Sequence, residues 1–249
     1  MKDLIAIDNL RCSIFVPKVA YNGDNITKMM TAFPGYLPSS IPLGQVPFQL
    51  MGLPILPPDI NNQPWQLTSS NNKEVITFYD DKIDIIINLS NIKYSVELLK
   101  ETSKHCCEMF ERIMNTFKFT SIRLAIAPTL RVPFGEKEHV TKSGFLSRVF
   151  LLNEFEGTHT DNCDFSQVFR INRQLHDKTY LVNHLIKFST EQINKIENNT
   201  LHVNEVLVSS LDINTFVNPT YNMGISELNE FYQKSPNWCE NLINYYFFV

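Results

Sequence analysis

This 249-residue chain contains few glycines and few charged residues, and it lacks any long apolar run. Its eight glycines and 13 prolines follow no period, which excludes a fibrous protein of the collagen type. No stretch approaches the roughly 18 consecutive apolar residues of a membrane-spanning helix, so we expect no membrane span. Asp3 and Asp8 interrupt the apolar run that a signal peptide needs, and we therefore expect a cytoplasmic protein.

The motifs that identify common enzyme classes are also missing. The chain has no G-x-S-x-G, no P-loop, no G-x-G-x-x-G and no H-E-x-x-H. A hydrolase or nuclease with a scattered Cys, His and Asp site is one alternative, although the spacing of Asp84 and Glu97 does not fit a metal nuclease. The absence of these motifs favours a protein that is not an enzyme and binds no cofactor.

Cysteine is sparse, and its five positions do not form a disulfide framework, so we expect reduced thiols. His105, Cys106 and Cys107 are consecutive in a predicted helix, where neighbouring side chains diverge by about 100° and cannot converge on one metal. His159 and Cys163 share a polar loop, but a structural zinc needs a second ligand pair. We therefore expect no bound metal.

What the chain does contain is enough apolar surface for a full core. It is 43% hydrophobic and 12% aromatic, which excludes a disordered protein. The formal net charge is −4, and the charge is unevenly distributed: residues 1–149 carry a net +2 and residues 150–249 a net −6. Nucleic acid is bound through basic residues, so this distribution argues against nucleic acid lying across the second half.

Apolar residues at every second position predict strands, and apolar residues spaced three or four positions apart predict helices. We expect helices at residues 24–33, 95–117 and 225–248, with Ser95 as the N-cap of the second and a break near Ser235-Pro236 in the third. Pro17 indicates an edge strand or an early strand end, and Pro128 an interruption. The predicted strands are 10–19, 74–79, 82–89, 119–127, 144–155, 165–175, 178–189 and 202–213.

These elements predict an α+β fold with antiparallel sheet and two long amphipathic helices. We expect residues 1–249 to form a single compact unit. The similar rhythm of its halves, 1–143 (β, Pro-rich segment, β-β-α-β) and 144–249 (β-β-β-β-α), suggests a pseudo-duplication.

The segment Pro34–Trp65 holds eight of the 13 prolines and no charged residue before Asp59. One interpretation is an extended segment buried against the fold. The other is a docking surface for a partner protein, because prolines reduce the entropy lost on binding and uncharged apolar side chains suit an interface core. The predicted partner contacts are Phe48, Leu50, Leu53 and Ile55.

A nucleic-acid-binding module using the 119–131 strand is the main alternative, with Lys118, Arg123 and Arg131 as its candidate contacts. Phe117, Phe119 and Phe134 could stack on bases. These phenylalanines flank the strand and do not alternate with its basic residues, which favours an exposed sheet face balanced by acidic neighbours.

Several short segments occur in an order that resembles a sporadically distributed family of bacterial proteins of similar length and unknown function. These segments are Trp65-Gln66-Leu67, VITFYDDKIDI, Tyr94, SIRLAIAPTLRV, SSLDINTF and ISELNEFY. The resemblance implies an α+β fold and no known activity, and such proteins often look like accessory genes of mobile or defence-associated loci. We therefore predict a non-enzymatic interaction or accessory protein of a bacterial (antiviral) defence or toxin-related system, with a protein partner that a neighbouring gene could encode.

Overall fold

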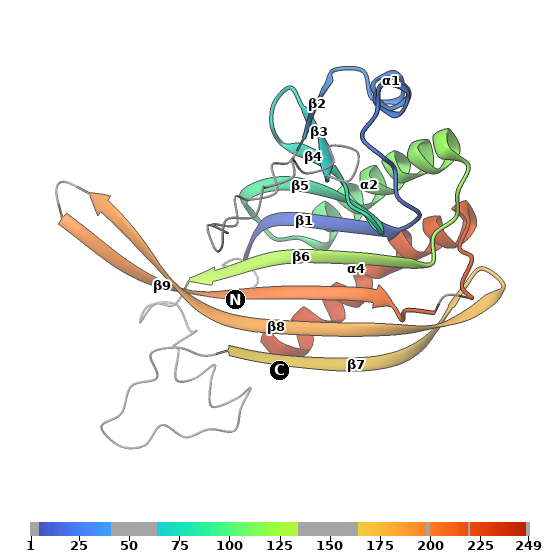
Figure 1. Ribbon diagram of the computed structural model, residues 1–249. Coiled ribbons are helices and arrows are strands. Elements are labelled where there is room, and N and C mark those ends of the chain that lie inside the picture. Colours follow the sequence, from blue (N-terminus) through green and yellow to red (C-terminus); the bar gives the residue numbers. More distant parts are fainter. Residues whose placement is uncertain (1–4, 41–63, 134–163, 198–199, 219, 248–249) are drawn as a thin grey trace, which may run out of the picture.

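The computed structural model describes residues 5–40, 64–133, 164–197, 200–218 and 220–247. These residues form an α+β structure with a large antiparallel sheet of nine strands and three helices (Figure 1). The strand order is β2-β3-β4-β5-β1-β6-β9-β8-β7, so strands from both halves of the chain contribute to one continuous sheet.

The strands are β1 (Ala6–Phe15), β2 (Tyr36–Ser40), β3 (Trp65–Ser69), β4 (Glu74–Phe78), β5 (Lys82–Lys93), β6 (Arg123–Pro133), β7 (Asp164–Leu175), β8 (Lys178–Glu197) and β9 (Thr200–Thr215). The helices are α1 (Gly23–Ala32), α2 (Val96–Phe117) and α4 (Ile225–Phe247).

Helices α2 and α4 lie side by side on one face of the sheet, while α1 lies near β2 (Figure 1). The two helices run antiparallel, because Tyr94 before α2 contacts Glu240 late in α4, whereas Glu111 late in α2 contacts Asn229 early in α4. The core lies between these helices and the sheet, where every second strand residue is apolar. Fully buried examples are Ile14, Ile85, Leu124, Ile126, Ile186 and Ile213.

The most regular local patterns are confirmed. Helix α2 begins after Ser95, whose hydroxyl accepts a hydrogen bond from the Leu98 backbone N–H at 3.0 Å. Strands β4 and β5, expected at 74–79 and 82–89, pair as a hairpin through Asp80 and Asp81. His176 has a φ of 52°, which reverses the chain between β7 and β8. In these segments the local sequence is sufficient because caps and turns act on neighbouring residues.

Strand β1 differs from its prediction. It begins at Ala6 instead of residue 10 and lies at the centre of the sheet, between β5 and β6. It does end before Pro17, as expected. Helix α1 begins one residue earlier than predicted, and its N-cap is Asn22, which accepts from the Asn25 backbone N–H at 2.9 Å.

Strand β6 continues through Pro128, contrary to the predicted interruption. The register between β6 and β9 has no pairs at Ala127 and Pro128, so the absent proline N–H falls at a gap in the ladder. The strand begins at Arg123 instead of residue 119, so Ile122 lies before it and is 39% exposed.

Helix α4 is continuous through Pro236, so the predicted break near residue 235 is wrong. Proline cannot donate the helical hydrogen bond to the carbonyl four residues earlier, which here belongs to Tyr232. The Ser103 hydroxyl of α2 donates to that carbonyl at 2.8 Å instead. A contact from the neighbouring helix therefore satisfies the acceptor that the proline leaves free.

We expect Ser103→Ala to destabilise the protein by about 1–2 kcal/mol, because it leaves the buried Tyr232 carbonyl without a donor. In a Pro236→Ala background the new backbone N–H can take over that acceptor, and the same serine substitution will cost about 1 kcal/mol less. Urea unfolding of the wild type, both single variants and the double variant measures this coupling. Equal costs of Ser103→Ala in the two backgrounds would contradict the explanation.

Some predictions fall outside the described residues. They are the strand at 144–155, the boundary at 143/144, the polar loop of His159 and Cys163, and the partner contacts Phe48, Leu50, Leu53 and Ile55.

Candidate functional site

A groove of about 650 Å³ lies between α2 and α4. Helix α2 contributes Lys100, Lys104, Cys107, Glu108 and Glu111, and α4 contributes Asn229, Tyr232, Gln233 and Asn237. Within each helix, every one of these residues lies three or four positions from another of the set, so they share one helix face. The sides of α2 and α4 that face each other therefore form the two walls.

The wall formed by α2 changes charge along its length. Lys100 and Lys104 lie toward the start of the helix, and Glu108 and Glu111 follow toward its end. A rise of 1.5 Å per residue separates Lys100 from Glu111 by about 16 Å along the axis. Lysine four residues before glutamate is the less favourable order for helix stability, so stabilisation of α2 does not explain this arrangement.

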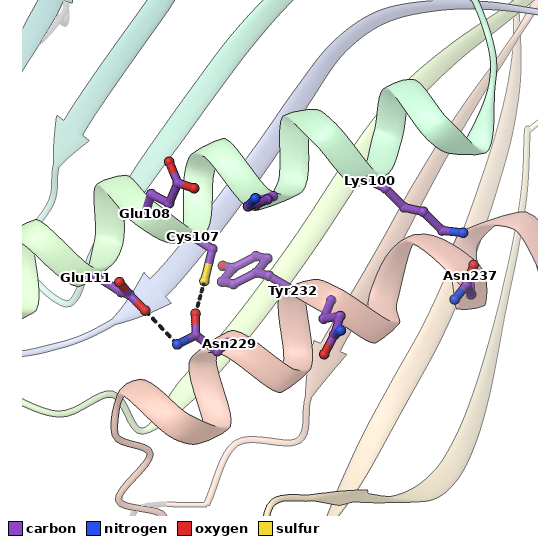
Figure 2. A pocket seen from close by; sticks show the side chains of 9 residues that line it. Lys100, Cys107, Glu108, Glu111, Asn229, Tyr232 and Asn237 are labelled. Carbon is purple, nitrogen blue, oxygen red and sulfur yellow. Dashed lines mark hydrogen bonds between the residues drawn. The ribbon is translucent and has the colours of Figure 1, made fainter.

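The wall formed by α4 is neutral and carries amide groups. Figure 2 shows Asn237 facing the Lys100 end of the groove and Asn229 beside Glu111 at the other end. The Cys107 thiol donates to Asn229 Oδ1 at 2.9 Å, and Asn229 Nδ2 donates to Glu111 Oε1 at 2.6 Å. These hydrogen bonds connect the helices at the carboxylate end.

The Cys107 thiol acts here as a donor and not as a nucleophile. Burial raises the pKa of Cys107 to about 12, with the nearby Glu111 carboxylate adding to the effect. At neutral pH the group is therefore protonated, whereas the thiolate is the reactive form.

Tyr232 forms the floor of the groove. Its ring is buried, and its hydroxyl reaches through the helix layer to the sheet, where it bonds to the backbone carbonyls of Ser13 at 2.9 Å and Ala125 at 3.0 Å. Burial raises the pKa of Tyr232 well above its ordinary value. The hydroxyl is thus occupied, and no histidine is among the described residues that line the groove.

The arginines of the predicted nucleic-acid strand lie elsewhere, on the sheet face that points away from α2 and α4, which we call the far face. Arg123 and Arg131 are eight residues apart on β6, or about 26 Å at 3.3 Å per residue. The Arg123 guanidinium lies 4.7 Å from the centre of the Phe15 ring, and burial lowers its pKa despite the nearby Asp212.

Arg131 lies in a polar hollow of about 370 Å³ on the far face. Its Nε is 2.5 Å from Asp8, and its second terminal nitrogen is 3.6 Å from Glu191. Lys118 caps the C-terminus of α2 with a φ of 58°, before the start of β6 and away from Arg131. The structure therefore does not bring Lys118, Arg123 and Arg131 together in one patch.

Sequence reasoning did not find the groove. The polar face of the predicted helix 95–117 is visible in the sequence, but it looks like an ordinary solvated face. The groove forms only because the face of α4 that carries the amides lies beside it, and α4 comes more than 110 residues later in the chain. No local signal reports that contact.

Comparisons of the chain with protein-family models, curated proteins and solved structures found no match. Among the described residues, no helix has the combined length and apolarity to cross a membrane. In the same part of the chain, no group of three His, Cys, Asp or Glu side chains is arranged to hold a metal ion. The four cysteines that the structure describes, Cys12, Cys106, Cys107 and Cys239, are buried free thiols.

Proposed function

We propose that this protein is a non-enzymatic protein-interaction protein that binds a segment of a partner protein in the groove between α2 and α4. One observation carries the proposal: among the described residues that line the groove, the thiol and the tyrosine hydroxyl are both engaged as hydrogen-bond donors, and the other groups are charges and amides. Its thiol has a pKa of about 12, and its tyrosine hydroxyl is bonded to two backbone carbonyls. Such a site is suited to binding a ligand rather than to reacting with it.

The charges of the groove indicate the kind of segment that fits. A carboxylate of the partner would lie near Lys100 and Lys104, and a basic group near Glu108 and Glu111. A length of about 16 Å corresponds to about five extended residues. Side-chain amides both donate and accept hydrogen bonds, so the asparagine and glutamine side chains of α4 suit the backbone of an extended peptide.

The proposal includes a pseudo-duplication of the chain, supported by the strand order, with the division before β6 and not at residues 143/144 as the sequence pattern suggested. From the centre outward, β1 matches β6, β5 matches β9, β4 matches β8 and β3 matches β7. Helix α2 follows β5, and α4 follows β9. In this scheme α2 and α4 are equivalent helices, and the groove lies where the two halves meet.

A cytoplasmic location and an accessory role in a bacterial defence or toxin-related system are part of the proposal. They are supported by the resemblance to the bacterial family and by the free thiols. The partner contacts at Phe48, Leu50, Leu53 and Ile55 stay a prediction, as does a neighbouring gene for the partner.

A photo-crosslinking amino acid placed at Gln233, inside the groove, tests the proposed function. We expect irradiation of cells that naturally make the protein to join it to one protein partner, identified by mass spectrometry. The matched control is the same amino acid at Asn241, which is exposed on α4 but does not line the groove. Crosslinks to nucleic acid, the same crosslinks from both positions, or none from Gln233 would overturn the proposal.

The charges of the groove provide a second measurement. Lys100→Glu combined with Lys104→Glu will lower the crosslink yield from Gln233 at least tenfold, because it removes the only cations that line the groove among the described residues. The control is Lys28→Glu on the exposed side of α1. Equal yields from the two variants would contradict the assigned polarity.

A further inference from the structure

The outer edge of β7 is a second surface with the properties of a binding site. Strand β7 is the last in the sheet order and pairs with β8 through 12 consecutive residue pairs without a register shift. No described residue pairs with its other side. Alternate backbone N–H and C=O groups of an edge strand point away from the sheet, so this side is a template for another strand.

The opposite edge of the sheet has features that prevent such pairing. Strand β2 has only five residues and contains Pro38, which lacks a backbone donor. Strand β7 has 12 residues with no proline, no lysine and no bulge. Among the described strands, the edge without these features is therefore the long and regular β7.

Exposed apolar side chains gather around the same edge. Of the nine large hydrophobic residues that are exposed in the described part of the chain, Val168 and Ile171 belong to β7, and Phe216 and Tyr245 belong to segments whose side chains contact it. Arg170 lies 5.5 Å from the centre of the Phe216 ring, which places Phe216 against β7. Tyr246, adjacent to Tyr245, donates a hydrogen bond to Gln167 of β7. Patches of this kind mark interaction sites.

The charge near this edge is positive. Strand β7 contains two arginines, Arg170 and Arg173, and one carboxylate, Asp164 at its first position. On the far face, the exposed Lys187 of β8 pairs with Ser166, which lies four residues before the exposed Arg170 on β7. A second copy of this chain would add arginines to arginines at the edge, whereas an acidic strand would bring complementary charge.

We propose that the outer edge of β7 binds an extended acidic segment of a partner protein as an additional strand of the sheet. Backbone hydrogen bonds to β7 provide the affinity. Carboxylates of the segment that face Arg170 on the far face, and apolar residues that face Ile171 on the opposite face, provide the selectivity. The site is separate from the groove between α2 and α4, and it is tested separately.

Hydrogen exchange with defined peptides tests the inference. The probes are the peptide acetyl-TVEVEVT-amide and the same peptide with lysine in place of both glutamates. We expect alternate amides of β7 to exchange rapidly in the free protein and to become protected with the acidic peptide, which should bind at least tenfold more tightly than the basic one. Slow exchange of all β7 amides in the free protein, or equal binding of the two peptides, would overturn the inference.

Variants separate this edge from a general charge effect. Arg170→Glu will weaken binding of the acidic peptide at least tenfold, whereas Arg112→Glu, the same change on an exposed position of α2, will leave it unchanged. The variants Ile171→Pro and Asn172→Pro test the backbone contacts. One of these two neighbouring amides donates to β8 and the other points to the outer edge, so only one of the two prolines will lower the melting temperature. The variant that keeps its melting temperature has lost the outward amide, and we expect it to lose peptide binding.

Two further outcomes count against the edge. Protection of amides in α2 and α4 instead of β7 would assign the acidic peptide to the groove. A stable dimer of the free protein that Arg170→Glu dissociates would make a second copy the occupant. Neither result depends on crosslinking from Gln233, so the groove and the edge can fail independently.

Discussion

Replacing Leu124 with aspartate will leave the protein unfolded or insoluble. Leu124 is fully buried on β6, opposite Ile14 of β1, on the side of the sheet that α2 and α4 cover. An unpaired carboxylate at such a position costs several kcal/mol, comparable to the total stability of about 5–15 kcal/mol of an ordinary domain. Circular dichroism and the soluble fraction after expression measure the result.

Arg123→Ala is the matched control because it changes the neighbouring residue, which points to the far face. The variant loses the contact of the guanidinium with the Phe15 ring, and we expect it to fold with a melting temperature only a few degrees lower. If the two variants melted alike, the alternation assigned to β6 would be wrong.

Lowering the pH from 7 to 4 will destabilise the protein by about 3 kcal/mol through His184 alone. His184 lies on β8, is 3% exposed, and its ring centre is 5.7 Å from that of Trp238 on α4. Burial lowers the pKa of His184 to about 4, and the nearby Arg173 adds to the effect. The unfolded chain, with a histidine pKa near 6.5, binds the proton more tightly, so stability is complete above pH 6.5 and is lost as the pH falls toward 4.

His184→Gln isolates this contribution, because glutamine does not titrate. Urea unfolding at pH 7, 6, 5 and 4.5 will show a smaller loss of stability for the variant than for the wild type over that range. The aspartate and glutamate carboxylates change the pH profile of both proteins in the same way. Parallel profiles would show that His184 is not the buried neutral group.

Elements stabilised by neighbouring residues were predictable from the sequence. Helix α2 shows this best, because Ser95 caps its first turn and its buried residues repeat every three or four positions. At the start of β5, Ile83 and Ile85 alternate with Lys82 and Asp84, and the turn before them is short. Such patterns act within a few residues and need no knowledge of the rest of the fold.

Both incorrect interpretations of proline have the same cause. Pro128 and Pro236 each remove a backbone donor, and local rules then predict the end of an element. The strand continues because the missing donor meets a gap in the β6–β9 ladder, and the helix continues because Ser103, more than 130 residues earlier, supplies another donor. Both compensations come from other parts of the chain.

The sequence by itself determined the α+β class, most of the described elements, although not β2 and β3, and the faces that the regular elements bury. The tertiary structure alone decided that β1 lies at the centre, that α2 and α4 enclose a groove, and that β7 lies at an edge. Periodicity reports which side of an element avoids water, because burial acts on each residue separately. It does not report which two polar faces meet or which strand is last, since these depend on contacts between residues far apart in the chain.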